Sequence, residues 1–395
     1  MSKYGWVEDD RLQTKTFNGK PIVNINSEHL IDASKVALLL SEPEKRLGWT
    51  GYRFDSRPKY LPGEEPLEET TIEDLIVPDP DPVSFEDSDN TYRYQYSSKV
   101  APAVVKAVHG LLNFKELDKV DTVAIGQWGG RGTDSRDAQD LLELLVEHEA
   151  SLPNLKAFFI GAVTTLDLDI NDIPLPYMGV FLNYFTQLDS FKARGKPDQP
   201  EKRVARHKSH RADTSTFFEV PLYHLNLKEL VIETAVMDKQ TIENLSKSHL
   251  PKLERLELWF GDLSYCYFEE AENMLEAVRL LLKNSFPSLR YLGLRNASQT
   301  NDFAIMLADS PLLGQLEELD LSLGIFSDSG AQALLKSSYL SNLKKLTFYH
   351  HQIKDLGLLR QFEAKLPAVD FNNGVDERCY ESSDGYSDIG VFIYE

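Results

Sequence analysis

Apolar residues recur along the chain in a six-residue pattern that places them at its first, fourth and sixth positions. Five clear copies begin at residues 227, 253, 289, 316 and 343, so successive copies start 26, 36, 27 and 27 residues apart. In an extended chain the fourth and sixth positions point to one side and the fifth points to the other. Each copy therefore predicts a short strand with one buried and one outward face.

Four fainter copies begin at residues 120, 155, 188 and 366, which makes nine copies between about residues 115 and 375. A period of about 20–29 residues is typical of leucine-rich repeats. Neighbouring repeats stack because no single unit can bury its own apolar face. We therefore expect an α/β fold, a leucine-rich-repeat horseshoe (a solenoid of parallel strands and helices) over residues 115–375.

The residues between the copies are expected to return as helices. Residues 269–282 carry apolar side chains at helical spacing. After the copy that begins at residue 316, Ser327 and Asp328 precede a second helical segment. Short polar side chains accept hydrogen bonds from the first N–H groups of a helix, so we expect Ser327 or Asp328 to cap this one.

Leucine-rich repeats usually carry asparagine or cysteine at the ninth position, and this chain does not. Its ninth positions hold Ala235, Gly261, Ala297, Gly324 and His351. We expect no asparagine ladder there, while the small residues still permit a tight turn.

The two ends of the chain lack the repeat. Residues 1–114 contain six prolines between positions 58 and 82, interspersed with acids, and proline disfavours long helices and central strands. We predict an N-terminal cap over 1–114, with an extended acidic stretch at 57–92, and an irregular insertion at 196–216. Residues 376–395 are predicted to form a C-terminal cap, anchored by Val391, Phe392 and Ile393.

The third, fifth and seventh positions of each copy line the outward, concave face of the predicted sheet. Aromatic residues and arginine carry much of the energy at protein interfaces, and several stand at these positions. The predicted partner-binding residues are Glu229, Glu233, Arg255, Glu257, Trp259, Tyr291, Arg295, Glu318, Asp320, Lys345 and Tyr349. Alternatively, the aromatic side chains fill a tight inner curve or contact a terminal loop.

Composition narrows the classes of partner. The 395 residues include 42 Lys+Arg and 62 Asp+Glu, a net charge of −20, which disfavours broad binding to nucleic acids or anionic membranes. Two cysteines cannot hold a chain of this size together by disulfides. The first residues do not form a secretory signal, and no apolar stretch of about 18 residues occurs. We expect a cytoplasmic protein with no membrane segment.

One basic segment contrasts with the acidic background. Residues 202–211 hold five basic residues, two histidines and no acid; the basic residues are Lys202, Arg203, Arg206, Lys208 and Arg211. They predict either a contact for an anion or an acidic partner, or an exposed loop between repeats. No aromatic residue interleaves them for stacking on bases.

No other motif predicts chemistry. The glycines at 126–132 follow a predicted strand, but neither G-x-G-x-x-G nor G-x-x-x-x-G-K-[ST] fits. His350 and His351 are adjacent on a strand and would point to opposite faces, which disfavours a shared metal ion. Cys266 has no identifiable base nearby. We therefore predict no catalytic residue, metal or cofactor, and a protein that is not an enzyme.

Several segments resemble a bacterial family of cytoplasmic leucine-rich-repeat proteins. They are LERLELWFGD (253–262), FPSLRYLGLRN (286–296), LADSPLLGQLEELDLSLGIFSDSGAQALL (307–335), FNGKPIV (17–23), VAIGQWGG (123–130) and LPNLKAFFIG (152–161). The repeats are similar to the ribonuclease-inhibitor subtype, whereas residues 162–187 and 196–216 depart from the family's pattern. This family has no assigned activity or partner, so the resemblance implies a fold and a compartment but no reaction.

Together these features predict a non-enzymatic protein–protein interaction scaffold that binds a macromolecular partner on its concave face. The acidic balance supports a second hypothesis, an inhibitor or immunity-type protein that neutralises a basic toxin or nuclease through steered association.

Overall fold

The structure is a computed structural model that describes 14 parts of the chain. They are residues 16–17, 20–24, 37–40, 108, 110–113, 117–126, 135–162, 170, 173–197, 216–261, 268–284, 286–371, 380–381 and 387–388. All of them lie within 1–43 and 99–395, which form one compact unit.

The described strands form a mostly parallel sheet in the order β1-β2-β3-β4-β5-β7-β9-β10-β11-β12-β13-β14. Their bounds are β1 Thr16–Phe17, β2 Lys20–Asn24, β3 Ala37–Leu40, β4 Thr122–Ile125, β5 Ala157–Ile160, β7 Ser190–Arg194, β9 Glu229–Glu233, β10 Arg255–Gly261, β11 Tyr291–Ala297, β12 Glu318–Asp320, β13 Lys345–Thr347 and β14 Ala368–Asp370. Among the described strands of this sheet, only β1 and β2 pair antiparallel. Two small sheets pair β6 (Pro174–Leu175) with β8 (Lys196–Pro197), and β15 (Tyr380–Glu381) with β16 (Ser387–Asp388).

Each of the nine copies of the apolar pattern contains one strand of the large sheet, so the predicted mixed α/β class is confirmed. The arrangement is compatible with a solenoid. Strands β2 and β3 lie outside the nine copies and continue the same parallel pairing, because β3 pairs with β4. The predicted anchors Val391, Phe392 and Ile393 lie outside the described residues.

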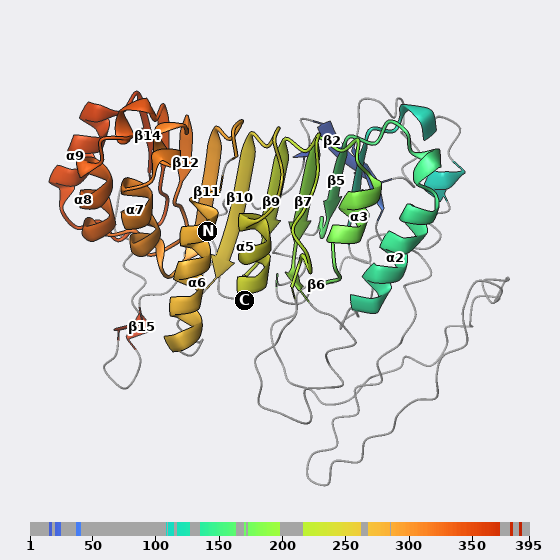
Figure 1. Cartoon of the computed structure of the whole chain (residues 1–395), viewed down its shortest axis with the longest axis horizontal. Helices are drawn as coiled ribbons and strands as arrows, with labels where there is room; N and C mark the ends of the chain where they lie inside the picture. Colours follow the sequence, from blue (N-terminus) through green and yellow to red (C-terminus); the bar gives the residue numbers. More distant parts are fainter. Residues whose placement is uncertain are drawn as a thin grey trace, which may run out of the picture. The chain divides into compact units, whose positions relative to one another are not determined.

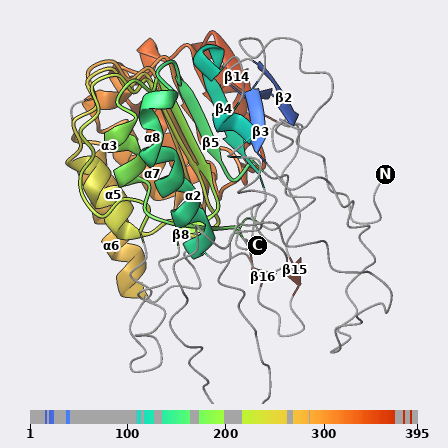
Figure 2. The same ribbon diagram turned by 90° about the vertical axis from the view of Figure 1, so that its right-hand side faces the viewer.

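Helices follow the strands and cover one face of the sheet, as Figures 1 and 2 show from two sides. They are α2 Ser135–Glu147, α3 Gly179–Tyr184, α5 Lys239–Ser246, α6 Phe268–Leu281, α7 Thr300–Ala308, α8 Asp328–Lys336 and α9 Leu356–Lys365, with short 3-10 turns at Leu117–Lys119, Glu149–Ser151, Pro311–Gly314 and Leu340–Asn342. The leucines of the pattern are buried between sheet and helices in one continuous core. The helix predicted at 269–282 is confirmed as α6.

The cap of helix α8 differs from the prediction. Ser327 is the N-cap residue, but its side chain accepts no capping hydrogen bond. Asn301 in the preceding helix instead accepts hydrogen bonds at Oδ1 from the N–H groups of Ser327 (3.0 Å) and Gly330 (3.2 Å). Asp328 accepts from the N–H groups of Lys354 and Asp355 in the following repeat. The start of helix α8 and the turn before helix α9 are thus each bound by a side chain of the preceding repeat, and the prediction of a local cap for α8 was wrong.

The residue just before the apolar pattern forms a side-chain hydrogen bond in most of the repeats, and together these bonds make a ladder along the stack. In six repeats an Asn, Gln or Ser there donates to a backbone carbonyl of an earlier turn. The pairs are Asn154–Asp118 (2.6 Å), Gln187–Leu152 (3.3 Å), Asn226–Thr186 (3.0 Å), Ser288–Pro251 (2.8 Å), Gln315–Phe286 (2.6 Å) and Asn342–Gly314 (2.6 Å). These bonds satisfy carbonyls that a turn leaves open, at the opposite end of the strand from the ninth position.

The ninth position needs a small residue where two repeats approach closely. Gly261 has φ +77°, and a Cβ there would lie 1.5 Å from the carbonyl oxygen of Ala235. His351 occupies a ninth position in another way: its Nδ1 accepts a hydrogen bond from the N–H of Ile353 at 3.1 Å. The expectation that small residues permit this turn is confirmed at Gly261.

Replacing Gly261 with alanine is expected to lower the free energy of unfolding by about 2 kcal/mol or more, because the new Cβ would overlap a backbone carbonyl at a positive φ. Gly179→Ala in α3 is the matched control, since a Cβ there meets nothing within 4 Å. The control is expected to be neutral or to stabilise by up to about 1 kcal/mol. Urea unfolding of both variants measures the difference, and equal effects would contradict the explanation.

Candidate functional site

The outward positions of neighbouring strands stack in register on the sheet face opposite the helices. Parallel pairing aligns residues of the same repeat position. The rows are Ser190–Glu229–Arg255–Tyr291–Glu318–Lys345 and Lys192–Val231–Glu257–Gly293–Asp320–Thr347. The predicted concave-face residues are therefore brought together on adjacent strands.

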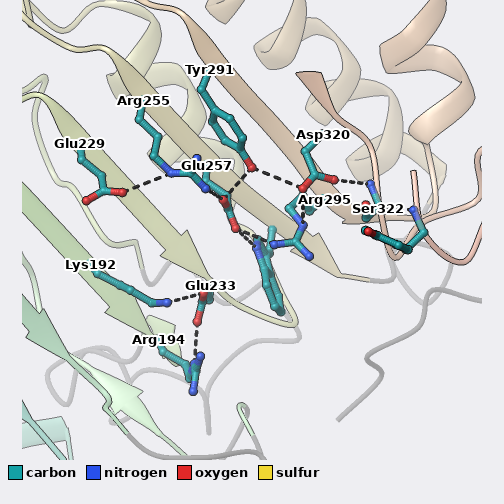
Figure 3. Close-up of polar contacts among 12 residues, drawn as sticks. Lys192, Arg194, Glu229, Glu233, Arg255, Glu257, Tyr291, Arg295, Asp320 and Ser322 are labelled. Carbon is teal, nitrogen blue, oxygen red and sulfur yellow. Dashed lines mark hydrogen bonds and ion pairs between the residues drawn. The ribbon is translucent and has the colours of Figure 1, made fainter. Parts of the chain in front are cut away.

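Glu257 on β10 lies at the centre of these contacts (Figure 3). Its Oε1 accepts hydrogen bonds from Trp259 Nε1 (2.9 Å) and Arg295 Nη1 (2.8 Å). Its Oε2 accepts from the Tyr291 hydroxyl (2.8 Å) and from Arg255 Nη2. Two donors at each oxygen occupy the lone pairs of the carboxylate, so Glu257 is fully satisfied within the protein.

Gly293 makes room for this arrangement. It is the register partner of Glu257, and a Cβ at this position would lie 3.0 Å from Glu257 Cγ and 3.1 Å from the Tyr291 hydroxyl. The tyrosine ring can therefore extend along the sheet, where the guanidinium of Arg255 stacks on it at 3.5 Å from the ring centre. Because Gly293 has no side chain, the predicted residues Arg255 and Tyr291 can stack on each other at this position.

Arg295 links Glu257 to the next strand. Its Nε lies 3.5 Å from Asp320 Oδ2, and its guanidinium lies 4.8 Å from the centre of the Trp259 ring. Asp320 Oδ1 in turn accepts a hydrogen bond from the N–H of Ser322 at 2.9 Å.

A second ion-pair cluster centres on Glu233. Its Oε1 lies 2.6 Å from Lys192 Nζ and its Oε2 lies 2.6 Å from Arg194 Nε, both on β7. Lys192 and Arg194 were not among the residues predicted for this face. They occupy the fifth and seventh positions of the faint copy that begins at residue 188, so the rule applied to the clear copies would have found them.

We call the eleven residues Lys192, Arg194, Glu229, Glu233, Arg255, Glu257, Trp259, Tyr291, Arg295, Asp320 and Ser322 the polar layer. Burial raises the pKa of the Glu257 carboxyl, but the charges of Arg295 and Arg255 outweigh it and hold that pKa well below its usual range. Against the same effect of burial, Arg194 and Lys192 lower the pKa of Glu233. Burial beside Glu257 and Asp320 raises the pKa of Tyr291, so its hydroxyl stays a donor. At neutral pH both glutamates are ionised.

The polar layer is buried at its centre and exposed along one side. Trp259 is 1% exposed and packs in a small apolar cluster with Ile170, Ala235 and Leu323. Glu257, Arg295, Asp320 and Glu233 are also buried. By contrast, the side chains of Glu229 and Arg255 are 34% and 37% exposed. The alternation of side chains along a strand predicted the face on which these residues lie, but it did not predict which of them are buried.

The remaining predicted residues lie at or beyond the margin of the polar layer. Glu318 is exposed, and Lys345 lies 3.7 Å from Asp370. Tyr349 is half-buried and donates its backbone N–H to Ser322 Oγ at 3.0 Å. The basic residues Lys202, Arg203, Arg206, Lys208 and Arg211 lie outside the described residues, as do Cys266 and the glycines at 129–132.

Within the described ranges, no three His, Cys, Asp or Glu side chains are grouped as a metal site would require. His351 is buried against the rings of Phe348 and Phe371. The helices described here include none that is long and apolar enough to cross a membrane.

Replacing Glu257 with glutamine keeps the shape of the side chain but removes the charge shared by Arg255 and Arg295. We expect the free energy of unfolding at pH 7 to fall by about 3–5 kcal/mol, because buried charges lose their partner. Glu276→Gln is the control: Glu276 is 56% exposed and lies 3.3 Å from Arg279. Its effect should stay below about 1 kcal/mol in the same urea titration.

The dependence of the unfolding free energy on acidic pH should also depend on the Glu257 carboxylate. The folded-state pKa of Glu257 lies below its unfolded value of 4.5, so its stabilising contribution is present above that pH and is lost as the pH falls further. We expect the difference in unfolding free energy between the wild type and Glu257→Gln to be constant near neutral pH. It should shrink below about pH 4.5. A difference that stays the same down to about pH 3 would contradict the assignment.

Neither a protein-family model nor a curated protein sequence matches the chain. A crystal structure of a protein from Bacteroides fragilis is similar to it, with a TM-score of 0.56 and 24% identity over 74% of this chain and 76% of that chain. A crystal structure of an internalin from Listeria monocytogenes gives a TM-score of 0.28 and 17% identity, over 65% of this chain and 55% of that one. At 24% identity the first similarity indicates a shared fold, but it does not indicate what the protein does. The TM-score of the second is too low to support an inference.

Proposed function

We propose that the protein is a non-enzymatic scaffold that binds a protein partner on the sheet face opposite the helices. The proposal includes a cytoplasmic, horseshoe-shaped leucine-rich-repeat solenoid of the ribonuclease-inhibitor subtype, with caps at residues 1–114 and 376–395. The recurrence of one strand followed by one helix in most of the repeats supports it.

The observation that supports the proposal is a row of partly exposed charges, of which Arg255 is held in place by a buried charge. Glu229 and Arg255 are partly exposed, and Lys345 further along is 41% exposed. The guanidinium of Arg255 donates a hydrogen bond to the buried carboxylate of Glu257 and stacks on the ring of Tyr291, so its position is fixed. A partner that binds such charges pays little side-chain entropy, because their positions are already ordered. This favours recognition of a complementary, specifically spaced charged surface.

The same geometry favours binding over catalysis. A general base needs an available lone pair and a pKa near the working pH. Glu257 has neither, since donors occupy both of its oxygens and its pKa is held far below neutrality. This buried carboxylate of the described face is therefore structural.

The alternative function, neutralising a basic toxin or nuclease, would favour an excess of negative charge on the binding face. In the polar layer four basic side chains (Lys192, Arg194, Arg255 and Arg295) balance four carboxylates (Glu229, Glu233, Glu257 and Asp320). The polar layer is thus electrically balanced and shows no excess of negative charge, which makes a scaffold with mixed-charge recognition the better-supported function.

Glu318→Lys tests the proposed face, because Glu318 is exposed and lies beside Lys345 in register. The matched control is Glu276→Lys on helix α6, where an exposed glutamate also lies beside a basic residue. Affinity purification from the native cell should capture a partner with the wild type and the control. Glu318→Lys should weaken that capture at least about tenfold, in line with placing like charges at an interface.

Circular dichroism and the urea midpoint establish that both variants are folded. Capture of the same partners at the same yield by all three proteins would contradict binding at this face. Loss of capture by Glu276→Lys alone would place the binding surface on the helices instead.

A further inference from the structure

A second ordered row of charges lies at the amino ends of the strands, outside the polar layer. It is formed by the second residue of eight successive repeats, and each of its side chains is partly or fully exposed. The residues, in order, are Asp121, Lys156, Asp189, Lys228, Glu254, Arg290, Glu317 and Lys344. Their charges alternate without exception, from negative at the first to positive at the eighth. We call this set the edge row.

Backbone hydrogen bonds make the members of the edge row direct neighbours. The N–H of Lys228 donates to the carbonyl of Asp189 at 2.7 Å, and the N–H of Lys344 donates to that of Glu317 at 2.7 Å. A backbone hydrogen bond of the same kind joins each of the remaining consecutive pairs in the row. Two pairs also approach through their side chains, Lys228–Asp189 at 3.6 Å and Lys344–Glu317 at 2.8 Å. The next position, Pro367, is uncharged, so the row ends there.

An alternating row with an even number of members is complementary to its own reverse. If a second copy is turned by a two-fold axis that passes between Lys228 and Glu254, every charge faces an opposite one. The facing pairs are Asp121 with Lys344, Lys156 with Glu317, Asp189 with Arg290, and Lys228 with Glu254, each twice. The spacing also matches, because both copies repeat at the distance between paired strands, about 4.8 Å. A two-fold interface requires this kind of self-complementary surface.

We propose that two copies of this chain associate through the edge row about this two-fold axis. The flanking residues near the axis are compatible with it. In the next row, Glu229 would face Arg255 of the second copy, and before the row Asn226 would face Lys252, so no like charges meet. Complementary charge mainly sets register and partner choice, so the dimer should be weak and sensitive to salt. Apart from Glu229 and Arg255, which lie next to the axis, the residues of the sheet face assigned to the protein partner lie outside this contact.

Stabilisation within one chain is the competing explanation, and two variants separate it from association. Lys228→Glu creates two like-charged neighbour pairs in the chain, with Asp189 and with Glu254. The double variant Lys228→Glu/Glu254→Lys also creates two, at 189/228 and at 254/290. Across the axis they differ: the single variant places carboxylates opposite one another, whereas the double variant restores opposite charges.

Sedimentation equilibrium of the full chain, from about 1 to 200 µM in about 50 mM salt, measures the association. We expect a wild-type dimer whose dissociation constant rises at least about tenfold in about 500 mM salt. Lys228→Glu should weaken the dimer at least about tenfold, and the double variant should return within about threefold of the wild type. Urea unfolding should show equal midpoints for the two variants.

Three results would overturn the proposal. They are a wild type that remains monomeric at low salt over this range, a dimer that neither variant affects, and a dimer that both variants weaken equally. The last result would assign the edge row to stability within one chain. None of these results bears on the sheet-face partner, which Glu318→Lys tests separately.

Discussion

In-register parallel pairing of the repeats is the constraint on which the rest of the structure depends. When Leu256 pairs with Leu230 on one side and Leu292 on the other, every other repeat position is aligned as well. One stacking operation therefore builds the leucine core, the side-chain ladder that includes Asn226 and Asn342, the polar layer and the edge row. A slip of one residue would turn the core positions outward, so the buried leucines strongly disfavour any other register.

In-register pairing also brings charged side chains of adjacent strands together on a partly buried face, and the contacts of the polar layer compensate for their loss of water. Charged side chains stacked on adjacent strands lose water where the face is buried, and a buried charge is tolerated when it is paired and hydrogen-bonded. Glu257 meets both conditions through donors on two strands, and Glu233 through two cations on β7. Such pairs add little to stability overall, but they are costly to break. The arrangement therefore holds a specific conformation, which a binding surface requires.

The repeat positions divide the surface into regions of different chemistry. Positions one, four and six are apolar and face the helices, while positions three, five and seven form the sheet face with its polar layer. Position two forms an exposed, alternating edge. Because these regions point in different directions, the proposed partner on the sheet face and the proposed second copy on the edge row share only Glu229 and Arg255, which lie next to the two-fold axis. Alternating sign also keeps the edge neutral in a chain with net charge −20.

Much of the fold could be predicted from the sequence, because apolar periodicity encodes which way each side chain points and how often the chain returns. The strands, helix α6 and the shared face of Glu257, Trp259 and Arg295 follow from that information alone. Contacts between repeats did not follow from it. Asn301 caps a helix of the next repeat, Glu257 binds arginines from two strands, and Trp259 is buried with Ile170. Periodicity sets direction, whereas burial and charge pairing depend on residues about 25–40 positions away or further, and only the folded chain brings those together.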